Sequence, residues 1–261
     1  MISTYCNLEY DIELSTVQNS VGGDMDTIHY HNSYEIYILE KGKRSYLIGA
    51  TLIEMKSGDV CFINPYEIHT TTGGSYKRHL ISFKEEYLDR FFKNEAKDVL
   101  LKCFKNKKIH LYPADYNHLM VLFEELSKDT NNFIIFSKIM EILSNATSLA
   151  SDITSNNSTI TEVIKYISNN YKKIENLDEI ANRFFISKFY LCRLFKTYTG
   201  ISVVKYINTL KLQYACELLI KTKKGIDAVS EECGFNSPMY FSKIFKNMFK
   251  ITPSQYRKIN S

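Results

Sequence analysis

Long apolar runs are absent from this sequence, and none approaches the ~20 residues that a membrane-spanning helix requires. The first ten residues, MISTYCNLEY, lack the basic stretch followed by an apolar stretch that marks a secretory signal. Cysteine is sparse, since six are scattered over 261 residues with no CxxC pair and no metal-type cluster. These absences argue against a membrane partner and a disulfide framework, and they predict a cytoplasmic protein with reduced thiols.

Sequence motifs of the common enzyme classes are also missing. There is no P-loop, no glycine motif for dinucleotides, and no pairing of a nucleophile with a base. We therefore expect a protein that is not an enzyme and that carries no cofactor. The composition, with 44% hydrophobic and 24% charged residues, is that of a globular chain, and the length is enough for roughly two domains.

Charge is divided unevenly along the chain. Residues 1–157 carry 16 Lys and Arg against 21 Asp and Glu, a net charge of −5. Residues 158–261 carry 17 against 8, a net charge of +9. A basic segment of this size is typical of domains that bind a polyanion, most often nucleic acid.

Hydrophobic periodicity divides the chain into a β-rich part and two helical parts. From about residue 28 to 83, short alternating bursts punctuated by glycines predict a small β-barrel or sandwich. Two amphipathic helices follow, and everything from residue 159 onward has a helical pattern. The predicted organisation is a β-barrel domain with appended helices, a linker and an all-α domain, with boundaries at 1–83, 84–150, 151–158 and 159–261.

The segment YLCRLFK (190–196) recurs fifty residues later as YFSKIFK (240–246). Each copy follows a short helical pattern and a turn. In the first copy Asn176 and Ser187 are placed to cap two helices, and Gly200 is placed to end the second. A helix, a short turn and a second helix form the helix-turn-helix arrangement.

The second copy has its own turn and cap signals. Gly234 suits a tight turn, Ser237 suits a helix cap, and Pro238 suits the first helical position. Basic and polar side chains fall on the outward faces of the two repeated helices. The candidate DNA-binding residues are Lys188, Phe189, Cys192, Arg193, Lys196, Ser237, Met239, Tyr240, Ser242, Lys243 and Lys246.

A long helical pattern of about 20 residues separates the two copies, which predicts a spacer of ~30 Å. One turn of B-DNA is about 34 Å, so such a spacer places two recognition helices in successive major-groove turns. A single helix-turn-helix pattern is weak evidence, because aromatic and basic stripes are common on ordinary helices. Two copies on a basic segment favour DNA binding over that alternative.

Residues 159–258 resemble the DNA-binding domain of the AraC/XylS family of transcriptional regulators, through LDEIANRFFISKFYLCRLFKTYTGIS and AVSEECGFNSPMYFSKIFKNMFKITPSQYR. The resemblance implies a sequence-specific activator with double-stranded promoter DNA and RNA polymerase as partners. Two positions depart from the family pattern: Cys192 stands where a hydrogen-bonding side chain is frequent, and Lys243 replaces a frequent Arg. Because Lys lacks the planar fork of Arg, we expect weaker base readout by the second unit.

The β-rich part resembles the cupin-like sensor domain of such regulators, in which a small molecule of unspecified type binds. The first cupin motif is complete, whereas the second departs around Pro65 and Gly73. We therefore predict a metal-free pocket, although the corresponding His and Glu positions bind a divalent metal in enzymatic cupins. The candidate ligand-binding residues are His29, His31, Glu35, Tyr37, Tyr46 and His69, together with the N-terminal arm.

Other functions remain open from the residues alone. A metal-dependent cupin enzyme tethered to a DNA-binding domain is the main alternative. An interaction scaffold is a third possibility, although a scaffold leaves the repeated helix unexplained.

Residues 115–150 carry many large apolar side chains, which predicts a homodimer formed through these helices. Met120, Phe136 and Met140 lie off the main apolar stripe and are the candidates to face a partner subunit.

Overall fold

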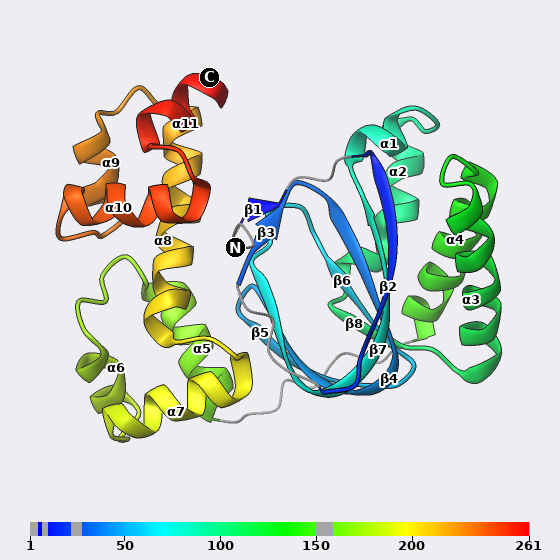
Figure 1. The fold of residues 1–261 in the computed structure, drawn as a ribbon, viewed down its shortest axis with the longest axis horizontal. Helices are drawn as coiled ribbons and strands as arrows, with labels where there is room; N and C mark the ends of the chain where they lie inside the picture. Colours follow the sequence, from blue (N-terminus) through cyan, green and yellow to red (C-terminus); the bar gives the residue numbers. More distant parts are fainter. Residues whose placement is uncertain (1–4, 7–9, 22–27, 150–158, 261) are drawn as a thin grey trace.

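The computed structural model describes residues 5–6, 10–21, 28–149 and 159–260. A β-barrel occupies the centre, a helical hairpin covers one side of it, and an all-helical domain lies on the other side (Figure 1). The predicted linker 151–158 and parts of the N-terminal arm (1–4, 7–9 and 22–27) fall outside the described residues. Within the described residues no helix is long and apolar enough to cross a membrane.

The barrel is built on one antiparallel sheet with strand order β2-β7-β4-β6-β8, and β5 pairs with β4. A short parallel pair, β1 with β3, lies beside it. The strands are β1 (Tyr5–Cys6), β2 (Ile12–Asn19), β3 (Tyr30–His31), β4 (Tyr34–Ile48), β5 (Thr51–Lys56), β6 (Asp59–Ile63), β7 (His69–Phe83) and β8 (Lys108–His110).

Strands β4 and β7 are 15 residues long and bend around the barrel. Their register shifts between Leu39 and Lys41 and again between Gly42 and Arg44. Bulges of this kind bend a strand and increase its twist. Gly42 has a φ of 100°, and a Cβ there would meet the Ser75 carbonyl oxygen at 2.3 Å, so glycine is required at the bend.

Because β4 bends, its outward side chains pack against different partners at its two ends. Ile36 and Ile38 belong to the core shared with the helical hairpin. Leu47, further along, belongs to the core shared with the all-helical domain. The alternate residues Tyr37 and Tyr46 point into the barrel interior, as the two-residue period of a strand requires.

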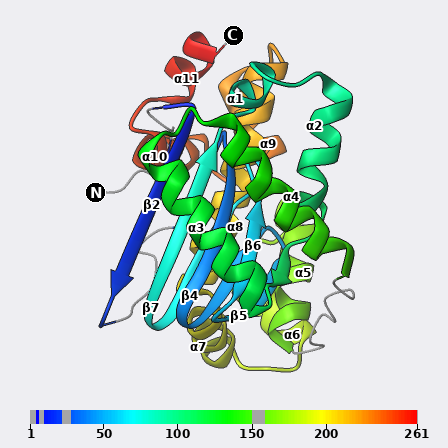
Figure 2. The same ribbon diagram turned by 90° about the vertical axis from the view of Figure 1, so that its right-hand side faces the viewer.

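Helices α3 and α4 cross the outer face of the sheet (Figure 2). The segment that the sequence predicts as helical, 84–150, also contains a strand, β8. This strand pairs with β6 and is the last strand at that edge of the sheet. Three residues are too few to show a strand period, so this strand leaves no sequence signal. The helices here are α1 (Glu85–Asp89), α2 (Asn94–Leu100), the 3-10 helix η1 (Leu101–Lys105), α3 (Pro113–Lys128) and α4 (Phe133–Leu149).

The prediction that Phe136 and Met140 face a partner subunit is wrong. Both side chains are fully buried against the sheet, and Met120 is half-buried against the same core. Phe136 packs edge-to-face on Phe83 of β7 and on Tyr87, at 5.1 and 5.2 Å between ring centroids. The hairpin buries a wider stripe than its helical period suggests, because it lies on a broad sheet face.

The C-terminal domain consists of α5 (Thr159–Asn170), α6 (Leu177–Arg183), α7 (Lys188–Thr199), α8 (Val203–Lys221), α9 (Ile226–Glu232), α10 (Pro238–Phe249) and α11 (Pro253–Asn260). The predicted caps are confirmed. Asn176 accepts the Glu179 backbone N–H at 3.0 Å. Ser187 accepts that of Tyr190 at 3.1 Å. Gly200 ends α7 with a φ of 75°.

The turn of the second helix-turn-helix is held against the rest of the domain at Gly234. Its φ is 79°, and a Cβ there would lie 2.0 Å from the Lys172 carbonyl oxygen. The buried Lys211 of α8 donates to the Gly234 carbonyl at 2.5 Å. This turn therefore depends on a residue without a side chain.

We expect Gly234→Ala to lower the free energy of unfolding by at least about 1–3 kcal/mol, because it combines a left-handed backbone with a backbone clash. Gly225→Ala is the matched control, since nothing lies within 4 Å of a Cβ at that position. Urea unfolding followed by circular dichroism measures both. Equal stability of the two variants would contradict the account of this turn.

Candidate DNA-binding surface and barrel site

Helix α7 separates an inner apolar face from an outer polar face. Leu191 and Phe195 are fully buried, which anchors the helix on the domain core. Phe189 is 90% exposed although it lies on the same helix. Of the other predicted contact residues here, Lys188, Arg193 and Lys196 are exposed and Cys192 is half-buried.

Helix α10 repeats this arrangement. Ser237 accepts the Tyr240 backbone N–H at 3.3 Å, and Pro238 is the first helical residue, both as predicted. Phe241 and Phe245 are fully buried, whereas Met239 is 82% exposed. The remaining predicted contact residues divide into exposed Tyr240, Lys243 and Lys246 and half-buried Ser237 and Ser242.

Helix α8 joins the two units and sets their separation. It has 19 residues, which corresponds to about 28 Å at the helical rise. The two units lie toward opposite ends of α8, with α7 near its start and α10 near its end (Figure 1). The length of α8 is therefore about 6 Å shorter than the ~34 Å of one turn of B-DNA.

Some exposed residues near α7 were not singled out from the sequence. Phe185 is 97% exposed in the turn before α7 and has a φ of 54°, which is unusual for an aromatic residue. Tyr190 is 42% exposed, and the Arg193 guanidinium lies 5.6 Å from its ring centroid. Asp178 of α6 was not singled out either, and it forms an ion pair with the predicted contact residue Lys188 at 2.8 Å. A turn residue held in a left-handed conformation has no reliable signal in a single sequence.

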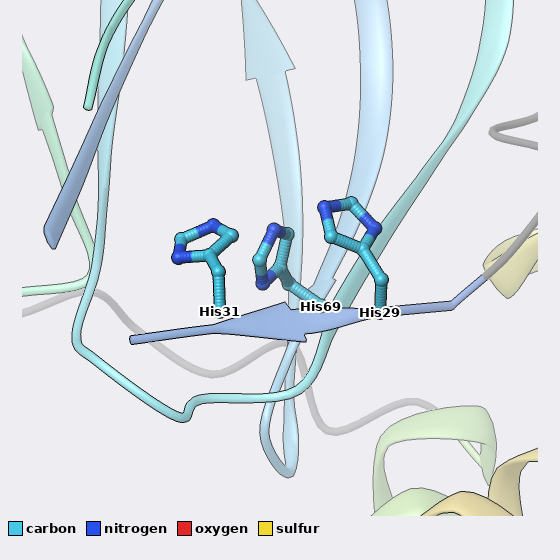
Figure 3. Close-up of side chains that lie close together, drawn as sticks. All are labelled: His29, His31 and His69. Carbon is cyan, nitrogen blue, oxygen red and sulfur yellow. The ribbon is translucent and has the colours of Figure 1, made fainter. Parts of the chain in front are cut away.

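The barrel site brings together the residues that were predicted to line a pocket. His29, His31 and His69 lie side by side on one side of β3 (Figure 3), and the rings of His29 and His69 are 4.2 Å apart. The His31 ring is 4.9 Å from that of His69. Glu35 Oε2 lies 3.1 Å from His31 Nε2 and 3.9 Å from His69 Nε2.

Two tyrosines complete this buried cluster. The Tyr46 hydroxyl donates to Glu35 Oε1 at 3.3 Å, and its ring stacks on His69 with centroids 6.2 Å apart. Tyr37 packs edge-to-face on Tyr46 at 5.0 Å. Burial raises the pKa of both hydroxyls, so both remain protonated at neutral pH.

Burial and the neighbouring charges set the protonation of the cluster. Burial alone would lower the pKa of His31, but the hydrogen bond and negative charge of Glu35 outweigh it and leave that pKa raised. Burial would also raise the pKa of Glu35, yet its hydrogen bond with His31 and the nearby imidazoles hold it well below its usual range. Burial and the neighbouring His29 lower the pKa of His69 well below its ordinary value.

The outer side of the same strand contacts the DNA-binding domain. Ile28 and Tyr30 belong to a hydrophobic cluster that includes residues of α5, α7 and α8. The Tyr30 hydroxyl lies 3.6 Å from Cys216 Sγ of α8. The Tyr30 ring centroid is 6.2 Å from that of Phe249 at the end of α10.

Three further hydrogen bonds link the two domains. The Tyr206 hydroxyl donates to the Gly49 carbonyl at 2.8 Å. The Ser45 hydroxyl donates to the Tyr198 carbonyl at 2.8 Å, and the Gln213 amide donates to the Tyr66 carbonyl. These contacts were not predicted, because tertiary pairing between distant segments leaves no periodic signal in one sequence.

Together, the two helix-turn-helix units and the barrel define a DNA-binding protein with a separate ligand-binding domain. The family description "AraC-like ligand binding domain" matches residues 24–143, and "Helix-turn-helix domain" matches residues 180–259. The chain belongs to the AraC family of DNA-binding transcriptional regulators, as the sequence predicted. Members of this family are regulators and not enzymes, so the alternative of a tethered cupin enzyme is set aside.

The chain is also similar to individual proteins, two of which are named as transcription activators. The chain is 21% identical to the transcriptional activator RhaS of Klebsiella pneumoniae over 252 residues, covering 88% of this chain and 87% of RhaS. It is 37% identical to the TetD protein of transposon Tn10 from Escherichia coli over 99 residues, covering 38% of this chain and 72% of TetD. It is 33% identical to the lactose operon transcription activator of Staphylococcus xylosus over 101 residues, covering 39% of this chain and 36% of that activator.

Proposed function

We propose that this regulator activates transcription by placing α7 and α10 in successive major-groove turns of a promoter and by contacting RNA polymerase there. The observation that carries the proposal is that both outer faces stay exposed while the DNA-binding domain is docked on the barrel. The names of two relatives, both activators, support activation. Such a protein acts where the DNA is, which in bacteria is the cytoplasm. A fall in transcript in a purified transcription reaction would contradict activation.

The two faces differ in how they read DNA. Arg193 of α7 offers the planar fork that binds guanine in the major groove. The corresponding position of α10 is Lys243, which contacts as a point charge. Lys196 and Lys246 lie one turn further along their helices, where contact with phosphates supplies affinity without sequence preference. We therefore assign most of the base readout to the first unit.

Substitution of these side chains tests the assignment. We expect Arg193→Ala to weaken specific binding by about 1–3 kcal/mol and to relax the preference at one base position. We expect Lys196→Ala and Lys246→Ala to weaken binding to all sequences and to reduce the salt slope by roughly 0.9 for each lost contact. Fluorescence anisotropy with specific and scrambled duplexes at several salt concentrations measures both effects.

Phe189 and Phe195 provide a matched pair on the same helix. Phe195→Ala removes a fully buried ring and is expected to cost about 3–5 kcal/mol of stability, so DNA binding is lost through unfolding. Phe189→Ala changes an exposed ring and is expected to weaken DNA binding with the melting temperature unchanged. If Arg193→Ala and Phe189→Ala both left affinity and preference intact, α7 would not be the recognition helix.

We further propose that the barrel binds a small-molecule effector next to Tyr37 and Tyr46. Among the described residues, the buried Tyr37 hydroxyl has no hydrogen-bond partner. A buried polar group without a partner costs free energy, which a ligand with a suitable acceptor recovers. The ligand would lie near His29 and His31, whose strand also contacts the DNA-binding domain through Ile28 and Tyr30.

A thermal-shift screen of small metabolites tests the effector site, because a ligand that binds the native state raises the melting temperature. We expect the shift caused by a true effector to be smaller in Tyr37→Phe and unchanged in Tyr112→Phe, which alters an exposed ring. An equal shift in wild type and Tyr37→Phe would place the effector elsewhere.

We retain the homodimer as a proposal, with the outer surface of the α3–α4 hairpin as the interface. After the burial of Phe136 and Met140, the large apolar side chains still exposed on this surface include Val121 and Ile134. If the promoter site is duplicated, as is frequent for regulators of this family, a second protomer raises the effective concentration at the DNA.

Sedimentation of the full chain at micromolar concentration is expected to give twice the mass of one chain. Ile134→Asp should shift the distribution to monomer, whereas Val99→Asp on α2 should leave the dimer intact, since Val99 is equally exposed but lies off the hairpin. A wild-type monomer at all concentrations would remove the proposed interface.

A further inference from the structure

Two of the three buried histidines of the barrel site have one ring nitrogen within hydrogen-bond distance of a backbone carbonyl. His31 Nδ1 lies 2.9 Å from the Ser33 carbonyl oxygen, and His69 Nδ1 lies 2.8 Å from that of Glu67. A carbonyl oxygen can only accept, so His69 Nδ1 carries the proton. His31 Nδ1 also lies 2.9 Å from the Ser33 hydroxyl, which can donate to it, so both tautomers of His31 fit its surroundings. In neutral His69 the other nitrogen, Nε2, then carries a lone pair, and so does Nε2 of His31 in the tautomer with the proton on Nδ1.

Both Nε2 atoms lie near the carboxylate of Glu35. Glu35 Oε2 lies 3.1 Å from His31 Nε2 and 3.9 Å from His69 Nε2. Tyr46 donates to the other oxygen, Oε1, which fixes the carboxylate with Oε2 toward the imidazoles. Among the described residues, His69 Nε2 has no hydrogen-bond partner, although it is completely buried. The site therefore gathers groups that can donate electron pairs around a buried nitrogen, His69 Nε2, that has no partner among the described residues.

The third imidazole adds to this arrangement. One ligand nitrogen from each of His29, His31 and His69 lies within 4.8 Å of the others. His29 is tied to His69 by two backbone hydrogen bonds of 3.1 and 2.9 Å, so the two strands hold these residues in register. In a tetrahedral zinc site with bonds of 2.0–2.1 Å, ligand atoms are about 3.3 Å apart. The observed separations need to contract by about 1.5 Å at most to reach that value.

We propose that His29, His31, His69 and Glu35 bind one divalent first-row transition-metal ion in the barrel. Imidazole nitrogens with a single carboxylate suit zinc, iron, cobalt or nickel rather than magnesium or calcium, which prefer oxygen ligands. The carbonyls of Ser33 and Glu67 supply the outer hydrogen bonds that metal-binding histidines normally make. The sequence predicts a metal-free barrel because the second cupin motif departs from the family pattern around Pro65 and Gly73. The histidine of that motif, His69, is nevertheless present.

A proton is the competing occupant of this site. A proton on His31 Nε2 converts its contact with Glu35 into a charge-assisted hydrogen bond. It leaves His69 Nε2 without a partner, however, because the 3.9 Å distance to Glu35 is too long for a hydrogen bond. A metal ion satisfies both nitrogens and the carboxylate together, which favours metal over proton.

The test uses the full chain, stripped with a chelator and dialysed against Zn²⁺ or Co²⁺. We expect one ion per chain and, with Co²⁺, the visible absorption of a four-coordinate site. His69→Gln and His31→Gln should each weaken Zn²⁺ binding by more than about 100-fold, since even outer-shell changes cost 10–100-fold. The control is His118→Gln on α3, an exposed histidine outside the cluster, which should bind as wild type.

Two results would overturn the site. One is wild type that takes up no Zn²⁺ at micromolar concentration. The other is Zn²⁺ bound equally well by wild type and His69→Gln. Melting of the chelated proteins checks that His69→Gln folds, and a Zn²⁺-induced rise in the wild-type melting temperature reports binding without any variant. These measurements contain no DNA, so their failure leaves the proposed promoter binding intact.

Discussion

The alternation of side chains along residues 28–31 is the constraint on which the rest of the molecule depends. Successive side chains of a strand point to opposite faces. His29 and His31 therefore lie with His69 in the barrel, while Ile28 and Tyr30 pack on the DNA-binding domain. This short stretch of backbone therefore joins the residues of the barrel site to the contacts that Ile28 and Tyr30 make with the DNA-binding domain.

The contacts between the barrel and the DNA-binding domain do not cover the DNA-binding surface. The docked domain contacts the barrel through Tyr206, Gln213 and Cys216 of α8 and through the end of α7. Phe189 and Met239 remain exposed on the recognition helices. The contacts between the barrel and the DNA-binding domain therefore leave these two recognition-helix side chains exposed.

The DNA-binding half could be predicted from the sequence in detail, because its signals are local. The caps at Asn176, Ser187 and Ser237 and the stop at Gly200 follow from neighbouring residues, and each is confirmed. The apolar periods also gave the buried faces of α7 and α10. Strand β8, the burial of Phe136 and the docking of the two domains depend on distant contacts, which one sequence does not encode locally. The cluster of three histidines could be predicted in part. A strand period places His29 and His31 on one face, but the third histidine, His69, joins them only through the pairing of His29 with His69.

The central claim is that one chain reads two successive turns of the major groove. Hydroxyl-radical footprinting of the full chain on the DNA upstream of its own gene measures this directly. The account predicts two protected patches on one face of the duplex, separated by about one helical turn of 10–10.5 base pairs. Substitution of Arg193 should remove one patch, and substitution of Lys243 together with Lys246 should remove the other. A single patch, or two patches that both disappear with the α7 variant alone, would contradict it.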